Sequence, residues 1–238
     1  SSFNVQSILL LSTALMLVSI GQLIVLLTGG IDLSVGPMMG LGLVITTTFM
    51  TEERGGGGIV LGVLVLLAAG LALGLLNGSL VRFARISPVI ATLATFIAVQ
   101  GVALKINPIP EGLLSPDVFD KLSTSIGDAI PVVFLVVCAI GIACEYLLRR
   151  GRFGRALRAV GSDETAAHRM GVRVGPTVLA AYILCAIFAA LASIMLAVQI
   201  GTGDAQAGQQ YTLQSIAAVA IGGASIYGGR GSMIGAVL

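Results

Sequence analysis

The chain has 238 residues, of which 56% are hydrophobic and only 10% are charged, and its mean hydropathy is +1.03. A water-soluble domain usually carries about 25% charged residues, so this chain has too little polar surface to form a soluble globule. The net charge of +2 is small and no block of basic residues occurs, which argues against nucleic acid as a partner.

Seven apolar segments follow one another along the chain, and a further one begins at Ser232. Backbone groups in lipid must be hydrogen-bonded within the protein, so these segments are helices or strands of a closed barrel. Barrel strands alternate apolar and polar residues, whereas runs such as VLGVLVLLAAGLALGLL do not. The sequence therefore predicts an all-α, polytopic transmembrane helical bundle. The seven segments comprise residues 8–27, 35–50, 59–81, 88–106, 130–148, 176–200 and 213–226.

The basic residues indicate how the bundle is oriented. If the loop at 149–175 is cytoplasmic, counting spans outward places all Lys and Arg residues except Arg54, Lys105 and Lys121 on the same side. This agrees with the positive-inside rule and predicts a multi-pass protein of the bacterial inner membrane. The connection at 107–129 then lies outside, where its prolines and acids suggest an ordered loop with a short helix.

The stretch TGGIDLSVG at residues 28–36 interrupts the first apolar region. Gly29 and Gly30 permit a bend, and Asp32 and Ser34 place a carboxylate and a hydroxyl inside the membrane. An acid in a span is costly and usually marks a pathway or a partner. The alternative is that Asp32 caps the next helix by accepting its free N–H groups. The two interpretations are compatible, and the sequence leaves both open.

A similar interruption occurs near the end of the chain, where GGASIYGGRGSMIGAV follows an apolar segment. Gly222 and Gly223 correspond there to the glycine pair of the first stretch, and the span count gives both breaks the same direction. Broken helices in matching positions point to a transport pathway. Glycines four residues apart, such as Gly70 and Gly74, further predict closely packed helices.

Polar residues within the apolar segments are candidates for lining the interior of the bundle. Their alternative role is helix capping or hydrogen bonding between helices. The candidates are Asp32, Ser34, Asn77, Ser87, Thr92 and Thr95.

The connection at 149–175 predicts a compact helical element on the cytoplasmic face. Ser162, Asp163 and Glu164 form a typical helix start, because acids favour the positive end of the helix dipole. The following ETAAHRM segment is expected to end at Gly171, and a second short helical segment precedes it at 154–160. His168 within this element is expected to be a solvated surface residue.

Several kinds of chemistry find no support in the sequence. The chain has only two lysines and no P-loop, so it does not itself hydrolyse nucleotides in the manner of P-loop ATPases. Its three cysteines make no metal-binding spacing, and no cofactor or metal site is expected. The GTGD stretch at 201–204 matches the GxGD pattern of intramembrane aspartyl proteases, whose mechanism needs two carboxylates at one site. Asp32 is the only other candidate, and the span count puts it on the side opposite to Asp204.

Taken together, the chain resembles the membrane permease of bacterial ribose-type sugar ABC importers, within the branched-chain amino acid and ribose permease superfamily. The resemblance extends over nearly the whole chain. It is carried by TGGIDLSVG, NGSLVRFARISPVIATLATFIAVQG, GRFGRALRAVGSDETAAHRMGV and SIAAVAIGGASIYGGRGSMIGAV. It implies that residues 1–238 are one permease domain, a fragment of a longer chain with further helices at both ends.

The resemblance also implies partners. They are two cytoplasmic ABC ATPase subunits, an extracytoplasmic sugar-binding protein, and a second permease subunit forming a homodimer or close heterodimer. ATP hydrolysis belongs to the ATPases, so the chain is not an enzyme. The loop at 149–175 is similar to the family's coupling loop, although Thr165 interrupts its usual Glu-Ala-Ala motif. The coupling residues are then Asp163, Glu164, Ala166, Ala167 and Gly171.

Three other functions stay open at this point. Within the same superfamily, the substrate could be a branched-chain amino acid or a nucleoside, although the forms GGIDLSVG and GGASIYGG favour a sugar. A secondary transporter would need no ATPase and would use a proton or sodium gradient. The aspartyl protease is the alternative from another class. The sequence does not identify the sugar.

Overall fold

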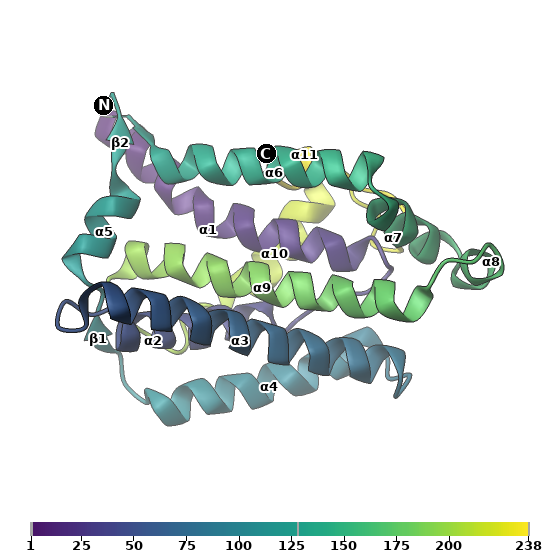
Figure 1. Ribbon diagram of the computed structural model, residues 1–238, viewed down its shortest axis with the longest axis horizontal. Helices are drawn as coiled ribbons and strands as arrows, with labels where there is room; N and C mark the ends of the chain where they lie inside the picture. Colours follow the sequence, from purple (N-terminus) through teal and green to yellow (C-terminus); the bar gives the residue numbers. More distant parts are fainter. Residues whose placement is uncertain (1, 128, 238) are drawn as a thin grey trace.

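The computed structural model describes residues 2–127 and 129–237 and consists almost entirely of helices packed side by side (Figure 1). The predicted all-α bundle with broken helices is confirmed. The helices are α1 (Ser2–Leu26), α2 (Val35–Phe49), α3 (Gly55–Arg82), α4 (Pro88–Ile106), α5 (Pro116–Ser123), α6 (Val132–Arg150), α7 (Arg152–Ser162), α8 (Glu164–Arg169), α9 (Val174–Ile200), α10 (Gln210–Ile221) and α11 (Met233–Val237).

Five helices, α1, α3, α4, α6 and α9, are long and apolar enough to cross a membrane. In contrast, α2 and α10 have 15 and 12 residues, too few to cross the hydrocarbon core at about 1.5 Å per residue. Two of the seven predicted segments are therefore partial spans. The prediction that 213–226 forms one segment was wrong at its end, because α10 stops at Ile221 and Gly223 takes a left-handed φ of +84°.

Helix α9 lies at the centre of the bundle and packs against α1, α2 and α3. Small residues allow this close packing. A Cβ on Gly74 would lie 2.4 Å from the Cα of Ile183, and one on Gly70 would lie 3.0 Å from the carbonyl oxygen of Ala186. The close approach predicted from the spacing of Gly70 and Gly74 is confirmed, and it fixes α3 against α9.

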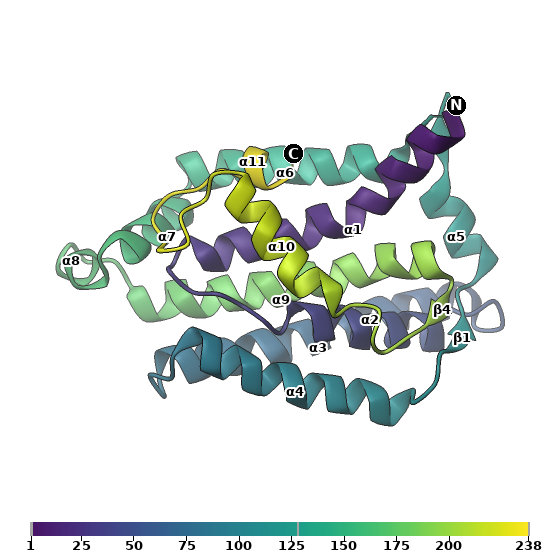
Figure 2. The same cartoon turned by 180° about the vertical axis from the view of Figure 1, so that it is seen from behind.

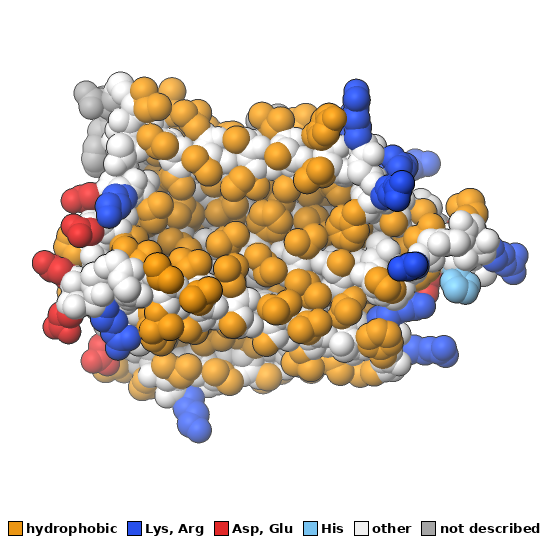
Figure 3. Space-filling model, in the orientation of Figure 1, with side chains coloured by type: hydrophobic (Ala, Val, Ile, Leu, Met, Phe, Trp, Pro, Cys, Tyr) orange, Lys and Arg blue, Asp and Glu red, His pale blue; other side chains and the backbone are white. Residues whose placement is uncertain are grey.

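Charged side chains gather at the two ends of the bundle, and its visible side is apolar (Figure 3). We call the end formed by α7 and α8 the basic end and the opposite end the acidic end. Large apolar residues along the sides, such as Leu64, Ile97 and Ile142, are well exposed, as expected for a surface in contact with lipid. The charge distribution agrees with the predicted orientation, in which the basic end is cytoplasmic.

The acidic end is closed by short elements. Strand β1 (Glu111–Leu113) pairs antiparallel with β4 (Thr202–Gly203), and β2 (Ser125–Ile126) pairs antiparallel with β3 (Ile130–Pro131). Strands β1 and β2 and helix α5 form the ordered loop with a short helix that the sequence predicts at 107–129, and β3 and β4 pair with it from outside this range.

Two non-helical segments lie at the basic end and lead back into the bundle (Figure 2). The first break, residues 27–34, connects α1 to α2, and the second break, residues 222–232, connects α10 to α11. Helix α1 runs to the basic end, where the chain turns at Gly29, whereas α10 ends beside the middle of α1 and the chain turns there at Gly223 before the second break extends to the basic end. Both glycines have a positive φ, and a short helix follows each break. The two breaks thus share a positive-φ glycine and a following helix, but they begin at different depths in the bundle.

The predicted cytoplasmic element is formed by α7 and α8, which project from the bundle at the basic end (Figure 1). Helix α7 follows α6 after Gly151 and contacts α8 and α9. Helix α8 ends at its C-cap residue Met170, and the chain then turns at Gly171, whose φ is +83°. The element is therefore attached to two long helices.

Candidate functional site

The first break carries a fully buried carboxylate. Asp32 is 0% exposed, and its Oδ1 accepts hydrogen bonds from the backbone N–H of Ser34 at 2.9 Å and from the Ser34 hydroxyl at 2.6 Å. The prediction that Asp32 caps the N–H groups of α2 was wrong in this detail, since the backbone donor to its carboxylate among the described residues is Ser34, which precedes the helix. The carboxylate therefore fixes the end of the break and not the first turn of α2.

Two long helices contribute side chains to this carboxylate and its serine. The amide Nδ2 of Asn77 on α3 donates to Ser34 Oγ at 2.8 Å and approaches Asp32 Oδ1 at 3.5 Å. The hydroxyl of Thr95 on α4 donates to Asn77 Oδ1 at 2.7 Å. These four residues, which we call the polar cluster, lie at most 4% exposed. The cluster joins the first break to α3 and α4 in the interior of the bundle.

Thr92 and Ser87 extend the cluster along α4 toward the basic end. The Thr92 hydroxyl donates to Pro88 O at 2.8 Å and contacts Ile31 O in the first break at 3.3 Å. Ser87 is the N-cap residue of α4, makes no side-chain capping bond and lines a pocket. Of the six polar residues predicted to line or frame the interior, five are buried, whereas Ser87 is exposed at the start of α4.

Two buried residues beside Asp32 escaped the sequence reasoning. Gln22 on α1 is 0% exposed, and with its amide oriented to satisfy both groups it donates to Asp32 O at 3.1 Å and accepts from Asp32 N at 3.3 Å. Tyr182 on α9 is also 0% exposed and lies beneath Gly30. Gln22 could have been recognised as a polar residue within an apolar segment, whereas nothing in the local sequence marks Tyr182.

The polar cluster is held by neutral donors. No basic side chain pairs with Asp32 among the residues that the structure describes, and its Oδ2 and the Tyr182 hydroxyl have no hydrogen-bond partner there. A buried carboxylate without a cation is costly unless hydrogen bonds compensate. Such a group is kept in the membrane interior where a pathway or partner uses it.

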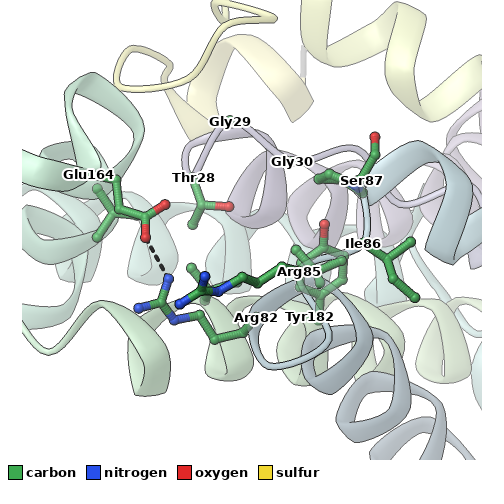
Figure 4. Close-up of a pocket in the computed structure, with 13 residues that line it drawn as sticks. Thr28, Gly29, Gly30, Arg82, Arg85, Ile86, Ser87, Glu164 and Tyr182 are labelled. Carbon is green, nitrogen blue, oxygen red and sulfur yellow. Dashed lines mark hydrogen bonds and ion pairs between the residues drawn. The ribbon is translucent and has the colours of Figure 1, made fainter.

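A pocket of about 540 Å³ lies at the basic end beside the first break. Its walls come from the first break, the turn between α3 and α4, α7, α8 and α9. Figure 4 shows Arg82 and Arg85 extending across it toward Glu164, with Gly30, Ser87 and Tyr182 at its inner wall. Arg82 donates to Glu164, and the two form an ion pair. The pocket thus lies between the first break, which carries Asp32 and Ser34, and the cytoplasmic element.

The predicted coupling residues lie where their sequence pattern places them in α8. Asp163 is the N-cap, and its Oδ1 accepts from the N–H of Ala166 at 2.9 Å, as the helix-start signal predicts. Glu164 is exposed at the first turn, Ala167 is buried, and Gly171 is exposed after the helix. The structure adds that Glu164 is bound to α3 through Arg82, which the sequence reasoning missed.

The two breaks touch each other and α7 through backbone. The N–H of Gly229 donates to Leu27 O at 3.0 Å. A Cβ on Gly161 would lie 2.0 Å from Leu27 O and 2.6 Å from Gly229 N, and one on Gly228 would lie 2.7 Å from Gly29 N. Three chain segments therefore meet at this glycine junction, which could not be located from the sequence.

The second carboxylate required of an aspartyl protease is not beside the first. Asp204 lies in the loop after α9, where its Oδ1 accepts from Gln206 N at 2.8 Å. The neighbouring Gly203 packs against Thr47 near the end of α2, while Asp32 precedes the start of that helix. The helical stretch between them rises roughly 18 Å, so the two acids do not form a shared-proton pair.

No metal site is formed by the residues that the structure describes, since they contain no group of three or more His, Cys, Asp and Glu side chains. His168 is exposed on α8. Cys138, Cys144 and Cys185 are free thiols in α6 and α9.

Comparison with known proteins places the chain among transport proteins. The model of the family described as branched-chain amino acid transport system / permease component matches residues 4–238. A probable ABC transporter permease protein of Sinorhizobium fredii, y4mJ, is 35% identical over 94% of this chain and 66% of its own length. The autoinducer 2 import system permease protein LsrC of Yersinia enterocolitica is 34% identical over 99% of this chain and 66% of its own.

The ribose import permease protein RbsC of Escherichia coli is 29% identical over 99% of this chain and 74% of its own length. The chain thus spans about two thirds of the length of the first two relatives. No solved structure matches the chain significantly.

Proposed function

Because the chain belongs to the family of permease components of branched-chain amino acid transport systems, we propose that it is the permease subunit of an ATP-driven importer of a monosaccharide in the bacterial inner membrane. Two relatives are named for the import of ribose and of autoinducer 2. The motifs GGIDLSVG and GGASIYGG at the two breaks favour a sugar over a branched-chain amino acid or a nucleoside as the substrate. The chain supplies the path, and partner subunits supply the free energy.

The observation that carries the proposal is the polar cluster at the first break. A sugar presents several hydroxyls, each of which is both a donor and an acceptor. The cluster provides a carboxylate acceptor, an amide and two hydroxyls from three elements, all buried in an otherwise apolar bundle. A few precisely placed polar groups on an apolar wall are typical of small-molecule sites.

The path proposed here runs from the cluster through the pocket of about 540 Å³ to the basic end. The inner wall of that pocket is made by Gly30, Ser87 and Tyr182, and its outer wall by Arg82 and Glu164. Movement of α8 would change the position of Glu164 and, through the ion pair, of the α3–α4 turn. The pocket would then open and close as the cytoplasmic element moves.

The partners are part of the proposal. Two ABC ATPase subunits would bind α7 and α8, with Asp163, Glu164 and Gly171 near the contact. A second permease subunit, identical or closely related, would complete the transmembrane part. An extracytoplasmic sugar-binding protein would dock at the acidic end, and lipid would cover the apolar sides.

ATP-dependent uptake tests the proposed function. The full-length chain is reconstituted in proteoliposomes with its ATPases and binding protein, and radiolabelled D-ribose, leucine and uridine are offered in turn. We expect uptake of D-ribose or a related monosaccharide only with ATP. Uptake of leucine or uridine alone would assign the rival substrates, and uptake driven by a proton or sodium gradient without ATP would assign a secondary transporter.

A further inference from the structure

Glu145 is a buried acid on α6 that the path described above does not use. It is 5% exposed, and its carboxylate accepts a hydrogen bond from the backbone N–H of Met233 at 2.7 Å and one from the Ser232 hydroxyl at 3.4 Å. Arg149, one turn later on α6, forms an ion pair with it. The carboxylate therefore connects a membrane-spanning helix to the start of α11.

The contacts of Glu145 match those of Asp32 at the first break. Each break ends in a serine directly before a short helix, Ser34 before α2 and Ser232 before α11. In each case the serine hydroxyl donates to a buried carboxylate that also accepts a backbone N–H. In the first break the carboxylate comes from two residues earlier. In the second it comes from a different helix, so it ties the end of the break to α6 by hydrogen bonds, beside the apolar packing of Val237 on Gly141.

Other hydrogen bonds also hold the second break. Arg158 Nη2 on α7 donates to Gly231 O at 3.2 Å, and the N–H of Gly229 donates to Leu27 O at 3.0 Å. Within the break, Ser225 N donates to Arg230 O at 2.9 Å. The position of the glycine junction, where this break meets α7 and the first break, therefore depends on how firmly each end of the break is held.

We propose that Glu145 is a positioning residue for transport: by holding Ser232 and Met233 against α6, it keeps the second break in contact with α7 and the first break. Displacement of α7 by the ATPases is then passed to both breaks together. The role in transport rests on the proposed function, whereas the anchoring of the second break to α6 does not.

Three variants in the full-length transporter test this role. Glu145→Ala removes both hydrogen bonds to the second break. Glu145→Gln keeps an oxygen that can accept from Met233 N–H. Arg149→Gln is the matched control, because it removes the ion pair and leaves the carboxylate's bonds to the break. Amide hydrogen exchange of the peptide covering 222–237 is measured, together with sugar taken up per ATP hydrolysed.

We expect Glu145→Ala to raise exchange in 222–237 by about tenfold or more, as the loss of a charge-assisted hydrogen bond allows. Exchange in α3 and α9 should not change, and uptake per ATP should fall. Glu145→Gln should restore most of the exchange protection and of the uptake, and Arg149→Gln should resemble the wild type.

Unchanged exchange in Glu145→Ala would overturn the anchoring role. Equally increased exchange in all helices, or wild-type uptake per ATP despite a loosened break, would overturn the role in transport. Wild-type proteoliposomes that take up no sugar would instead contradict the proposed function, and the exchange result would still decide whether Glu145 anchors the break.

Discussion

Asn77 and Ser34, which are 43 residues apart in the chain, are joined by a 2.8 Å hydrogen bond from the amide Nδ2 to the hydroxyl oxygen. This bond connects the basic half of α3 to the last residue before α2. Since Ser34 also donates to Asp32 and Asn77 accepts from Thr95, one buried amide links a helix interruption to two membrane-spanning helices. The break is therefore held in place by side chains from outside it.

Loss of the Thr95 hydroxyl should weaken the polar cluster measurably. Thr95→Val keeps the side-chain shape but leaves Asn77 Oδ1 without its donor, so the free energy of unfolding should fall by about 1–3 kcal/mol. Thr48→Val is the matched control, because the Thr48 hydroxyl is bonded only to Val44 O in its own helix and the residue is exposed. Unfolding in detergent measures both variants, and equal losses would show that the link to Asn77 contributes nothing.

Packing of α3 against α9 should depend on Gly74. Alanine there would place a Cβ 2.4 Å from the Cα of Ile183, so the two helices must separate, and we expect a loss of at least about 1–3 kcal/mol. Gly101→Ala on α4 is the control, since no described atom of another helix or loop lies within 4 Å of its Cβ position. The control should be neutral or slightly stabilising. A midpoint of unfolding unchanged by Gly74→Ala would contradict the packing described.

The ion pair between Arg82 and Glu164 should matter for coupling more than for stability. Its side chains are 32% and 57% exposed, and such surface pairs contribute about 0–1 kcal/mol. Glu164→Arg should therefore leave the unfolding midpoint nearly unchanged but lower the sugar taken up per ATP hydrolysed. The double variant Arg82→Glu with Glu164→Arg restores an ion pair of reversed polarity. If the double variant recovers no uptake, Glu164 acts through the ATPase and not through Arg82.

Much of this arrangement could be predicted from the sequence because lipid imposes simple rules. Apolar length located the five long helices among seven predicted segments, Lys and Arg residues predicted the orientation, and Gly70 and Gly74 marked a tight helix contact. The interruption at Asp32 was visible because an acid within an apolar run is conspicuous. The helix start at Asp163 followed from local capping chemistry, which depends on only a few neighbouring residues.

Contacts between distant segments could not be predicted, because hydropathy carries no information on which helices are neighbours. Asn77, Thr92 and Thr95 were recognised as polar residues in spans, but their meeting at Ser34 depends on how α3 and α4 surround the first break. Glu145 is near an arginine-rich helix end, where an acid is unremarkable. Its bond to Met233 arises from a return of the chain 88 residues later, and the backbone contacts of Gly161 have a similar origin.

The rate of ATP-dependent sugar uptake by Asp32→Asn tests most directly whether the polar cluster lies on the transport path. Asparagine keeps one oxygen that can accept the two bonds from Ser34, so the break should persist. It removes the negative charge, and its NH2 group takes the place of the second acceptor oxygen. We predict normal insertion, an unfolding midpoint close to the wild type, and an initial uptake rate lower by about tenfold or more, as expected when a buried acceptor for a ligand is lost. An uptake rate equal to that of the wild type would contradict the assignment of Asp32 and its partners to the path.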